Sequence, residues 1–348
     1  MSKHSIIPPS SAARRMACPG SRKLEASVPY QATDAAAEGT LAHALAAQAI
    51  DAKNRVEKMD YPDTEMSRHV QGYVDFLGDI RVKTNANVSE FEITREFPLV
   101  HAISFGTPDA VLRGNDQVHV IDLKYGFAPV QAYENWQLLT YASAFFNPTA
   151  TYHLHIYQPR DYISSSPIKT WTLTAPELLK YIARLQQSEE LALTDDAPLR
   201  AGTHCGHCSA KHLCPALQIA AAKVVEISSE PTALEQLPSH AAGELAILQD
   251  AAKVIDARIN ALETVVFEAL KNGASISQFI LSSYGRKSWN ISAREVITLG
   301  GLYGCDLHKE TKMEVLTPTQ AIKAGVPAEV IREFTNTPTK VKLERNSY

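Results

Sequence analysis

Two periods of apolar and polar residues alternate along the chain between residues 35 and 194. One recurs every three to four residues, as in amphipathic helices, and the other alternates residue by residue, as in strands. The helical period covers 35–57, 64–82, 131–146 and 175–194. The strand period covers 90–99, 105–113, 117–124, 151–158 and 168–173. The chain therefore predicts an α/β fold in which a helix precedes a three-strand meander, followed by a helix and further strands.

The region that follows has a different pattern. Segment 226–240 is polar and contains two prolines, which is typical of a linker. In 241–272, apolar residues recur at spacings of three and four, as in a long amphipathic helix. A strand pair around 278–291, with the turn Gly285-Arg286-Lys287, and short helices come next. We expect a first domain at 1–225, a linker at 226–240 and a mainly helical C-terminal region at 241–348.

Composition narrows the class of protein only a little. The 348 residues are 45% hydrophobic and 21% charged, which is typical of a globular protein. No stretch approaches the ~20 consecutive apolar residues of a membrane-spanning helix. The charged start also lacks the apolar segment that follows it in a secretory signal. We therefore expect a cytoplasmic protein without a membrane partner. The net charge of −4 decides nothing about nucleic acid, because local clusters of lysine and arginine bind phosphates.

Two acidic residues and a lysine interrupt the apolar strands. Asp122 and Lys124 are two apart, so they point to one face of a strand, and Asp109 on the preceding antiparallel strand can reach that face. Converging carboxylates suit Mg²⁺ or Mn²⁺. Such a metal would activate a water against a phosphodiester while the lysine stabilises the charge of the transition state. A salt bridge at a strand end is the alternative for Asp122 and Lys124 alone.

Two predicted helices carry further candidates. His43 follows Glu38-Gly39-Thr40 on the first helix, and a neutral imidazole can complete a metal site. Gln137 and Tyr141 lie four residues apart on the helix after the third strand, so they share one face. Taken singly, His43 could be an ordinary core or surface histidine. Gln137 could likewise be an incidental polar residue on an amphipathic helix face.

The cysteines are spaced as metal ligands rather than as disulfide partners. An odd number, five, in a chain expected in the cytoplasm argues against a disulfide framework. Cys205-x2-Cys208-x5-Cys214 is a compact cluster, and Cys18 is the best candidate for a fourth thiolate, whereas Cys305 is expected to be an ordinary buried thiol. Four thiolates suit a [4Fe–4S] cluster or Zn²⁺. The histidines that could replace a zinc ligand are His204, His207 and His212.

These elements occur in the order of a known nuclease family. Residues 8–220 resemble RecB-like PD-(D/E)xK nucleases with an iron–sulfur cluster, and one cysteine before the core with three after it resembles the AddB-type and CRISPR-adaptation-associated branches. The C-terminal run Pro338-Thr339-Lys340-Val341 is similar to that of an uncharacterised phage- and prophage-encoded family. The resemblance implies a restriction-endonuclease-like core, a mixed central sheet flanked by helices, within 1–225, closed by a four-cysteine [4Fe–4S] cluster.

The resemblance also implies roles for individual residues. The catalytic residues would be Lys124, Asp109, Asp122, Gln137, Tyr141 and Glu38. The ligands of Mg²⁺ or Mn²⁺ would be His43, Asp109, Asp122 and the backbone carbonyl of Leu123. The iron–sulfur ligands would be Cys18, Cys205, Cys208 and Cys214. Weaker candidates for phosphate contacts are Arg14, Arg15 and Arg160.

The activity that the resemblance implies is exonucleolytic, metal-dependent hydrolysis of DNA phosphodiester bonds in phage-type recombination, replication or repair. Expected partners are single- or double-stranded DNA, a single-strand annealing or other recombination protein, and further copies of the chain, in a bacterial cytoplasm. The alternatives are a catalytically silent DNA-binding or scaffold protein and a zinc-stabilised interaction protein. The sequence has no Walker A motif, so we expect no ATP-driven helicase in it.

Overall fold

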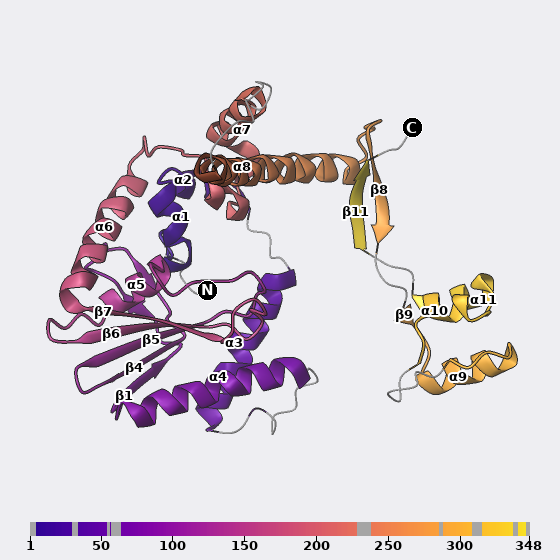
Figure 1. Ribbon diagram of the computed structural model, residues 1–348, viewed down its shortest axis with the longest axis horizontal. Coiled ribbons are helices and arrows are strands. Elements are labelled where there is room, and N and C mark those ends of the chain that lie inside the picture. The colour runs from indigo at the N-terminus through magenta and orange to yellow at the C-terminus, as the bar shows by residue number, and fades with distance from the viewer. Residues whose placement is uncertain are drawn as a thin grey trace. The chain divides into compact units, whose positions relative to one another are not determined.

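The chain forms two compact units, Met1–Arg258 and Ile259–Tyr348 (Figure 1). The computed structural model describes residues 5–29, 34–53, 56, 64–227, 238–284, 288–307, 315–336 and 340–345. All structural statements below concern these ranges, and each unit has its own hydrophobic core.

The boundary between the units lies inside one long helix, α8 (Pro238–Lys271). The expected boundary was the linker at 226–240, of which 228–237 lies outside the described residues. The start of α8 belongs to the first unit because Val254 and Ala257 pack in one apolar cluster with the cysteine-bearing segment that precedes α7 (Pro215–Ile227). The long helix predicted at 241–272 is confirmed by α8, which crosses the boundary between the two compact units. The domain limits expected from the sequence stay a prediction.

The first unit contains a five-stranded sheet between two layers of helices. Its other helices are α1 (Ala12–Ala17), α2 (Ser21–Glu25), α3 (Asp34–Ala52), α4 (Thr64–Lys83), α5 (Trp136–Ser143) and α6 (Ala175–Leu193). Its strands are β1 (Val88–Phe91), β2 (Arg95–Glu96), β3 (Phe105–Gly106), β4 (Ala110–Gly114), β5 (Gln117–Leu123), β6 (Thr151–Tyr157) and β7 (Ile168–Thr174). The predicted α/β fold with a mixed sheet flanked by helices is confirmed, with shifted ends of the elements.

The sheet has the order β1-β4-β5-β6-β7 and is mixed, because β5 and β6 run parallel and the other neighbours antiparallel. The meander expected from 90–124 is only partly correct: β1 pairs directly with β4, while β2 and β3 pair with each other outside this sheet. Asn115 and Asp116 have φ values of 50° and 54°, the positive values that a two-residue hairpin turn requires. This turn fixes the register of β4 against β5.

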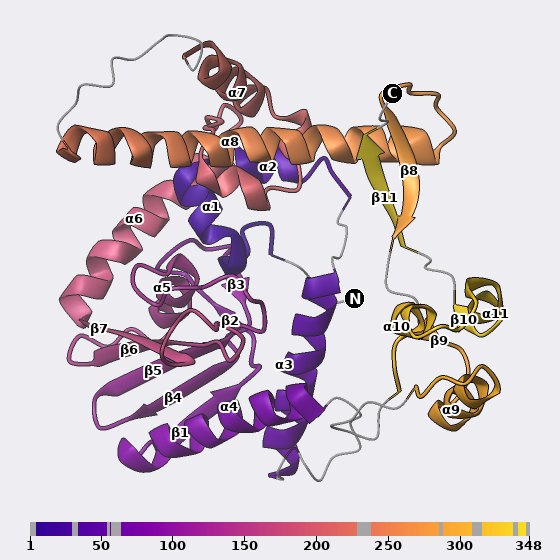
Figure 2. The same cartoon turned by 45° about the vertical axis from the view of Figure 1, so that its right-hand side comes forward.

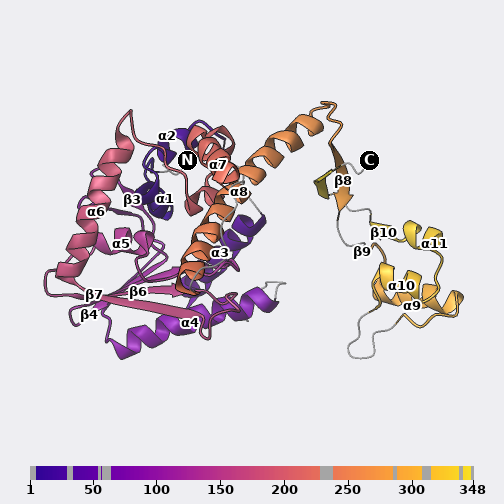
Figure 3. The ribbon, with the colours of Figure 1, turned by 45° about the horizontal axis from the view of Figure 1, so that its top comes forward.

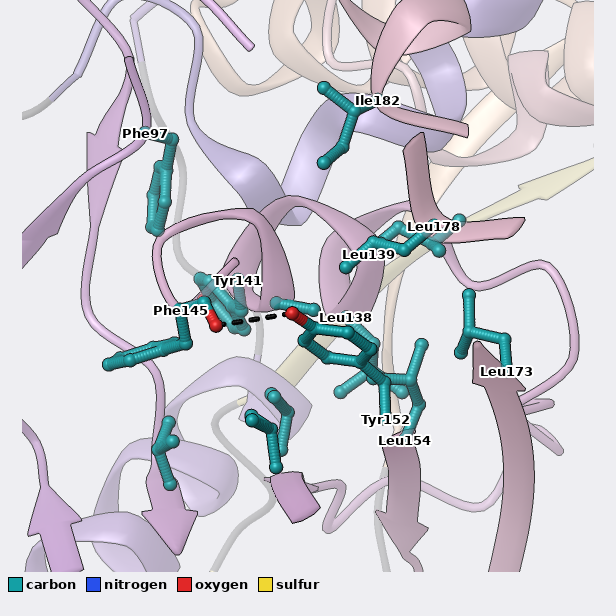
Figure 4. Close-up of a cluster of buried hydrophobic side chains, with 14 of the residues drawn as sticks. Phe97, Leu138, Leu139, Tyr141, Phe145, Tyr152, Leu154, Leu173, Leu178 and Ile182 are labelled. Atoms are coloured by element: carbon teal, nitrogen blue, oxygen red, sulfur yellow. Dashed lines mark hydrogen bonds between the residues drawn. The ribbon is translucent and has the colours of Figure 1, made fainter. Parts of the chain in front are cut away.

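Alternation along β5 assigns its side chains to two faces of the sheet. Val118 and Val120 belong to the core shared with α5 and α6, whereas Ile121 and Leu123 belong to the core shared with α3 and α4. Figure 2 shows these helical layers on opposite faces of the sheet, and Figure 4 shows the core around α5. The parallel pair β5–β6 requires a crossover, and α5 lies in that connection.

The second unit combines short helices with two small ribbons. Its elements are α9 (Ala293–Leu302), α10 (Pro318–Lys323), α11 (Ala328–Glu333), β8 (Phe279–Tyr284), β9 (Ser288–Trp289), β10 (Thr335–Asn336) and β11 (Lys340–Arg345). The hairpin expected at 278–291 is wrong, because β8 pairs with β11 and β9 with β10; residues 285–287 lie outside the described ranges. The three helices gather beside the β9–β10 ribbon (Figure 3). In the described parts of both units, every helix is too short or too polar to span a lipid bilayer.

Three histidines form a stack on the face of the sheet that α4 covers. The ring of His119 lies with its centroid 4.5 Å from that of His153 and 5.3 Å from that of His155. His119 Nδ1 and His155 Nε2 are 3.0 Å apart, and Phe76 of α4 makes an edge contact with His155. Burial, together with the neighbouring histidines, lowers the pKa of His119 to about 4 and that of His155 to about 3.

The stack predicts a loss of stability in mild acid. Histidines of the unfolded chain titrate near ~6.5, so below that pH the unfolded state binds protons that the folded stack excludes. The stabilising contribution is complete above pH ~6.5 and is lost as the pH falls towards the folded-state pKa values. We expect a His119→Gln, His155→Gln variant to lose less free energy of unfolding than the parent between pH ~7 and ~4 in urea titrations. His101→Gln should behave like the parent, and equal losses in all three proteins would contradict this prediction.

Candidate functional site

The candidate site begins where the β4–β5 hairpin places two carboxylates side by side. Ala110 pairs with Ile121, so the same register sets Asp109, the residue before β4, opposite Asp122. Asp109 Oδ2 accepts a hydrogen bond of 2.6 Å from the Leu123 amide. Asp109 is therefore bound to the backbone of β5 and held at the edge of the same face as Asp122.

Asp122 is the buried centre of the site, with 1% of its surface exposed. Its Oδ2 lies 2.7 Å from Lys124 Nζ, and its Oδ1 accepts a hydrogen bond of 2.9 Å from Gln137 Nε2. Lys124 Nζ donates to Gln137 Oε1 at 3.0 Å, and Gln137 Nε2 lies 3.1 Å from the Tyr141 hydroxyl. The structure thus brings four of the predicted residues into one closed network.

Gln137 reaches this network because of where α5 begins. Asn135 Oδ1 accepts hydrogen bonds of 3.1 Å from the amides of Gln137 and Leu138, which caps the helix immediately after the loop that leaves β5. The first turn of α5 is therefore fixed over the end of β5. Tyr141, one turn later, lies on the same face as Gln137.

Burial sets the charges of this network. Loss of water raises the pKa of Asp122 to about 6, with Asp109 adding to the rise and Lys124 opposing it. Burial lowers the pKa of Lys124, but the attraction of Asp122 outweighs burial and the pKa lies above its ordinary value. Asp122 and Lys124 therefore form a carboxylate–ammonium pair at neutral pH.

His43 of α3 joins the site from the other helical layer. His43 Nδ1 lies 3.4 Å from Asp109 Oδ1 and 3.7 Å from Glu92 Oε1. One ligand atom from each of these three residues lies within 4.8 Å of the others, as in a site that could hold a metal ion. Burial lowers the pKa of His43, but hydrogen bonds to Asp109 and Glu92 raise it to about 10.

Glu92 is the member of this group that sequence reasoning missed. It follows β1 with a left-handed φ of 51°, and its amide donates to the Asp109 carbonyl at 3.1 Å. The conformation turns its side chain towards His43 as the chain leaves the sheet. An acidic residue near the start of the strand predicted at 90–99 was the available signal, but no periodic pattern marks the turn that ends β1 there.

The predicted cysteine ligands also converge. The four residues are buried, unpaired by disulfides and line one small cavity: Cys18, Cys205, Cys208 and Cys214. Cys18 Sγ accepts a hydrogen bond of 3.2 Å from the Arg200 amide, and Cys205 Sγ one of 3.4 Å from the Gly202 amide. His204 lines the same cavity, and hydrogen bonding to Cys18 and Cys205 raises its pKa to about 10. Cys305 belongs to the second unit and is half-buried, with Sγ 2.9 Å from the Ala324 carbonyl.

The N-terminal arm is tied to the cysteine segment by charged side chains as well. Arg14 pairs with Glu25 at 2.8 Å, and Glu25 in turn accepts from the amide and hydroxyl of Ser209. Arg15 pairs with Glu189 of α6 at 2.5 Å, and both side chains are almost fully buried. These contacts join α1 and α2 to residues 174 and 184 positions later in the chain.

Comparison with known proteins identifies the family of this chain. The model of a family described as "Protein of unknown function (DUF2800)" matches residues 4–329. The chain belongs to this family. A solved structure described as "Crystal structure of SSO0001" is 16% identical with a TM-score of 0.32, and the match covers 62% of this chain and 89% of that chain.

The remaining predicted site residues of this DUF2800 protein have other contacts. Glu38, expected to be catalytic, pairs with Arg160 at 2.7 Å on an exposed part of α3. Leu123 contributes its amide to Asp109, and a role for its carbonyl stays a prediction. Arg15 is buried against Glu189, and its expected contact with phosphate stays a prediction. Arg14 Nη1 donates a hydrogen bond of 3.0 Å to the carbonyl of His207, which lies in the cysteine-bearing segment.

Proposed function

We propose that this DUF2800 protein is a metal-dependent nuclease of the PD-(D/E)xK type that hydrolyses DNA phosphodiester bonds. The observation that carries the proposal is the convergence of His43, Asp109, Asp122, Lys124 and Gln137 from both helical layers and the central hairpin. A buried lysine–carboxylate pair alone would serve stability. A half-exposed histidine–carboxylate group beside it favours catalysis, because such a group can hold a divalent cation at the edge of the sheet.

The residues present fit a Mg²⁺ or Mn²⁺ ion by the chemistry of their donors. Asp109, Glu92 and His43 would hold the ion, with Asp122 beside them, and oxygen donors predominate as these hard cations prefer. When bound, the ion would activate a water and neutralise charge on a phosphodiester. Lys124 presents an ammonium on the same face, where it stabilises negative charge that builds on the reacting phosphate. Gln137 holds Lys124 and Asp122 at hydrogen-bonding distance from each other.

The finer description of the activity follows the sequence resemblance. We infer an exonuclease that acts on single- or double-stranded DNA in phage-type recombination, replication or repair in a bacterial cytoplasm. A single-strand annealing or other recombination protein and further copies of the chain are the partners that this role implies. His43 and Glu92 are partly exposed, as residues that meet a substrate from solution must be.

The proposal predicts that Lys124→Ala abolishes most DNA hydrolysis. Loss of one transition-state donor lowers enzyme rates by roughly 10²- to 10³-fold, and we expect a loss of this order on end-labelled DNA with Mg²⁺ or Mn²⁺. The matched control is Lys83→Ala, an exposed lysine of α4 that pairs with Asp79 on its own helix. Hydrolysis that survives in Lys124→Ala, or that is absent from the parent protein, would contradict the proposal. DNA binding without hydrolysis would favour a catalytically silent scaffold.

We further propose that the four cysteines bind a [4Fe–4S] cluster. Four buried thiols around one cavity fit the ligand set, and the amides that donate to Cys18 and Cys205 resemble the hydrogen bonds that tune cluster sulfurs. Zn²⁺ is the alternative on the same donors. The cluster would join α2, the segment before α7 and the start of α8, because these elements share the apolar group around Cys205 and Cys214.

The cluster proposal predicts that Cys208→Ser loses both the bound metal and stability. Anaerobically purified parent protein should be brown and contain about four iron atoms and four sulfides per chain. Cys208→Ser should be colourless and unfold at a lower temperature, because metal binding of this kind contributes folding free energy. Cys305→Ser, which changes the cysteine of the second unit, should keep the parent's colour and iron. A colourless parent that contains zinc would contradict the iron–sulfur assignment.

A further inference from the structure

Two exposed aromatic rings lie close together beside the candidate site. Phe127 is 56% exposed and Tyr162 is 69% exposed, and their ring centroids are 6.2 Å apart. The guanidinium carbon of Arg160 lies 3.7 Å from the centroid of the Phe127 ring and 4.8 Å from that of Tyr125. Aromatic rings of this size normally bury their surface on folding, so a cluster left in water points to a ligand.

Hydrogen bonds from one buried side chain fix the loop that carries Phe127. The fully buried Gln158 donates 2.8 Å hydrogen bonds to the carbonyls of Gly126 and Ala128, the two neighbours of Phe127. Its Oε1 accepts a hydrogen bond of 2.8 Å from the Val130 amide. These hydrogen bonds fix the backbone on both sides of Phe127. The exposed position of the ring therefore follows from an ordered loop conformation.

The other members of the cluster are fixed as well. Arg160 Nη1 donates to Glu38 Oε2 at 2.7 Å, and the Tyr162 hydroxyl donates to Glu65 at 3.2 Å. These bonds hold the guanidinium against the Phe127 ring and tie Tyr162 to α4. Rigid aromatic groups lose little conformational entropy when they bind, which makes them effective contact surfaces.

The position of the cluster relates it to the proposed metal site. Phe127 is the third residue after Lys124, in the loop that leads from β5 to α5. Glu38, which holds Arg160, precedes His43 on α3 by five residues, or roughly 7.5 Å along the helix axis. A chain of nucleotides whose phosphate reaches Lys124 would therefore pass the aromatic cluster.

We propose that Phe127 and Tyr162, with Arg160, form a stacking platform for unpaired nucleobases of a DNA strand that enters the metal site. Base faces are covered by neighbouring bases in a duplex but exposed in a single strand, and aromatic and arginine planes bind them in proteins that hold single strands. The inference rests on the proposed nuclease function and deepens it, because it identifies single-stranded DNA as the form that is bound at the site. It also assigns a role to Arg160 through its plane rather than through a phosphate contact.

The platform predicts that binding depends on the bases of the strand. We would measure fluorescence anisotropy of labelled oligo(dT) and of an abasic strand of equal length, on full-length Lys124→Ala protein so that the strand stays intact. Stacking contributes ~1–3 kcal/mol per base, so Phe127→Leu should raise the Kd for oligo(dT) by about 5- to 150-fold. Tyr162→Leu should act in the same direction, and the Kd for the abasic strand should stay unchanged in both variants.

The control is Tyr303→Leu, which removes an exposed tyrosine of the second unit and should leave both Kd values unchanged. An unchanged Kd for oligo(dT) in Phe127→Leu, or an equal rise for the abasic strand, would overturn the platform. Far-ultraviolet circular dichroism verifies that each variant is folded. The readout is binding and not hydrolysis, so a protein that binds oligo(dT) through its bases but never cleaves it would refute the nuclease and leave the platform standing.

Discussion

The carboxylate of Asp122 is buried in the central strand of a sheet, and its charge is kept by two neighbours, Lys124 and Gln137. A buried carboxylate that loses its partners destabilises the fold by several kcal/mol. The elements that carry those partners must therefore keep their positions. The β4–β5 turn must keep its register, and α5 must begin at the cap formed by Asn135. The same constraint carries Asp109 to the edge of the sheet, where His43 from the opposite helical layer reaches it.

A second constraint closes the first unit on itself. Residues near the start of the chain are joined to residues near 200 by the cysteine cavity and by the buried pair of Arg15 with Glu189. Removal of one partner from such a pair leaves an uncompensated charge and costs roughly 3–5 kcal/mol. The arm is therefore part of the fold of the first unit, and the proposed cluster would reinforce contacts that charged and apolar side chains already make.

Periodicity and short spacings predicted the mixed sheet and its flanking helices, because these follow from strand alternation and one tight turn. The same alternation placed Asp109, Asp122 and Lys124 on one face, whereas the roles of Gln137 and Tyr141 came from the family resemblance. Glu92 was missed because its side chain is aimed by a left-handed backbone conformation that leaves no periodic signal. The burial of Arg15 against Glu189 could not be read from local patterns, because the two residues lie 174 positions apart in the chain. The β8–β11 and β9–β10 pairs join residues far apart in sequence, which local patterns do not encode.

The central claim is that a divalent cation binds between His43 and Asp109. Pulsed electron paramagnetic resonance of Mn²⁺ bound to the protein tests it most directly, because an imidazole ligand adds a nitrogen coupling to the Mn²⁺ spectrum. The account predicts this coupling in the parent protein and its loss in His43→Gln, with weaker Mn²⁺ binding in Asp109→Asn. A parent spectrum without nitrogen coupling, or a coupling that persists in His43→Gln, would contradict the claim.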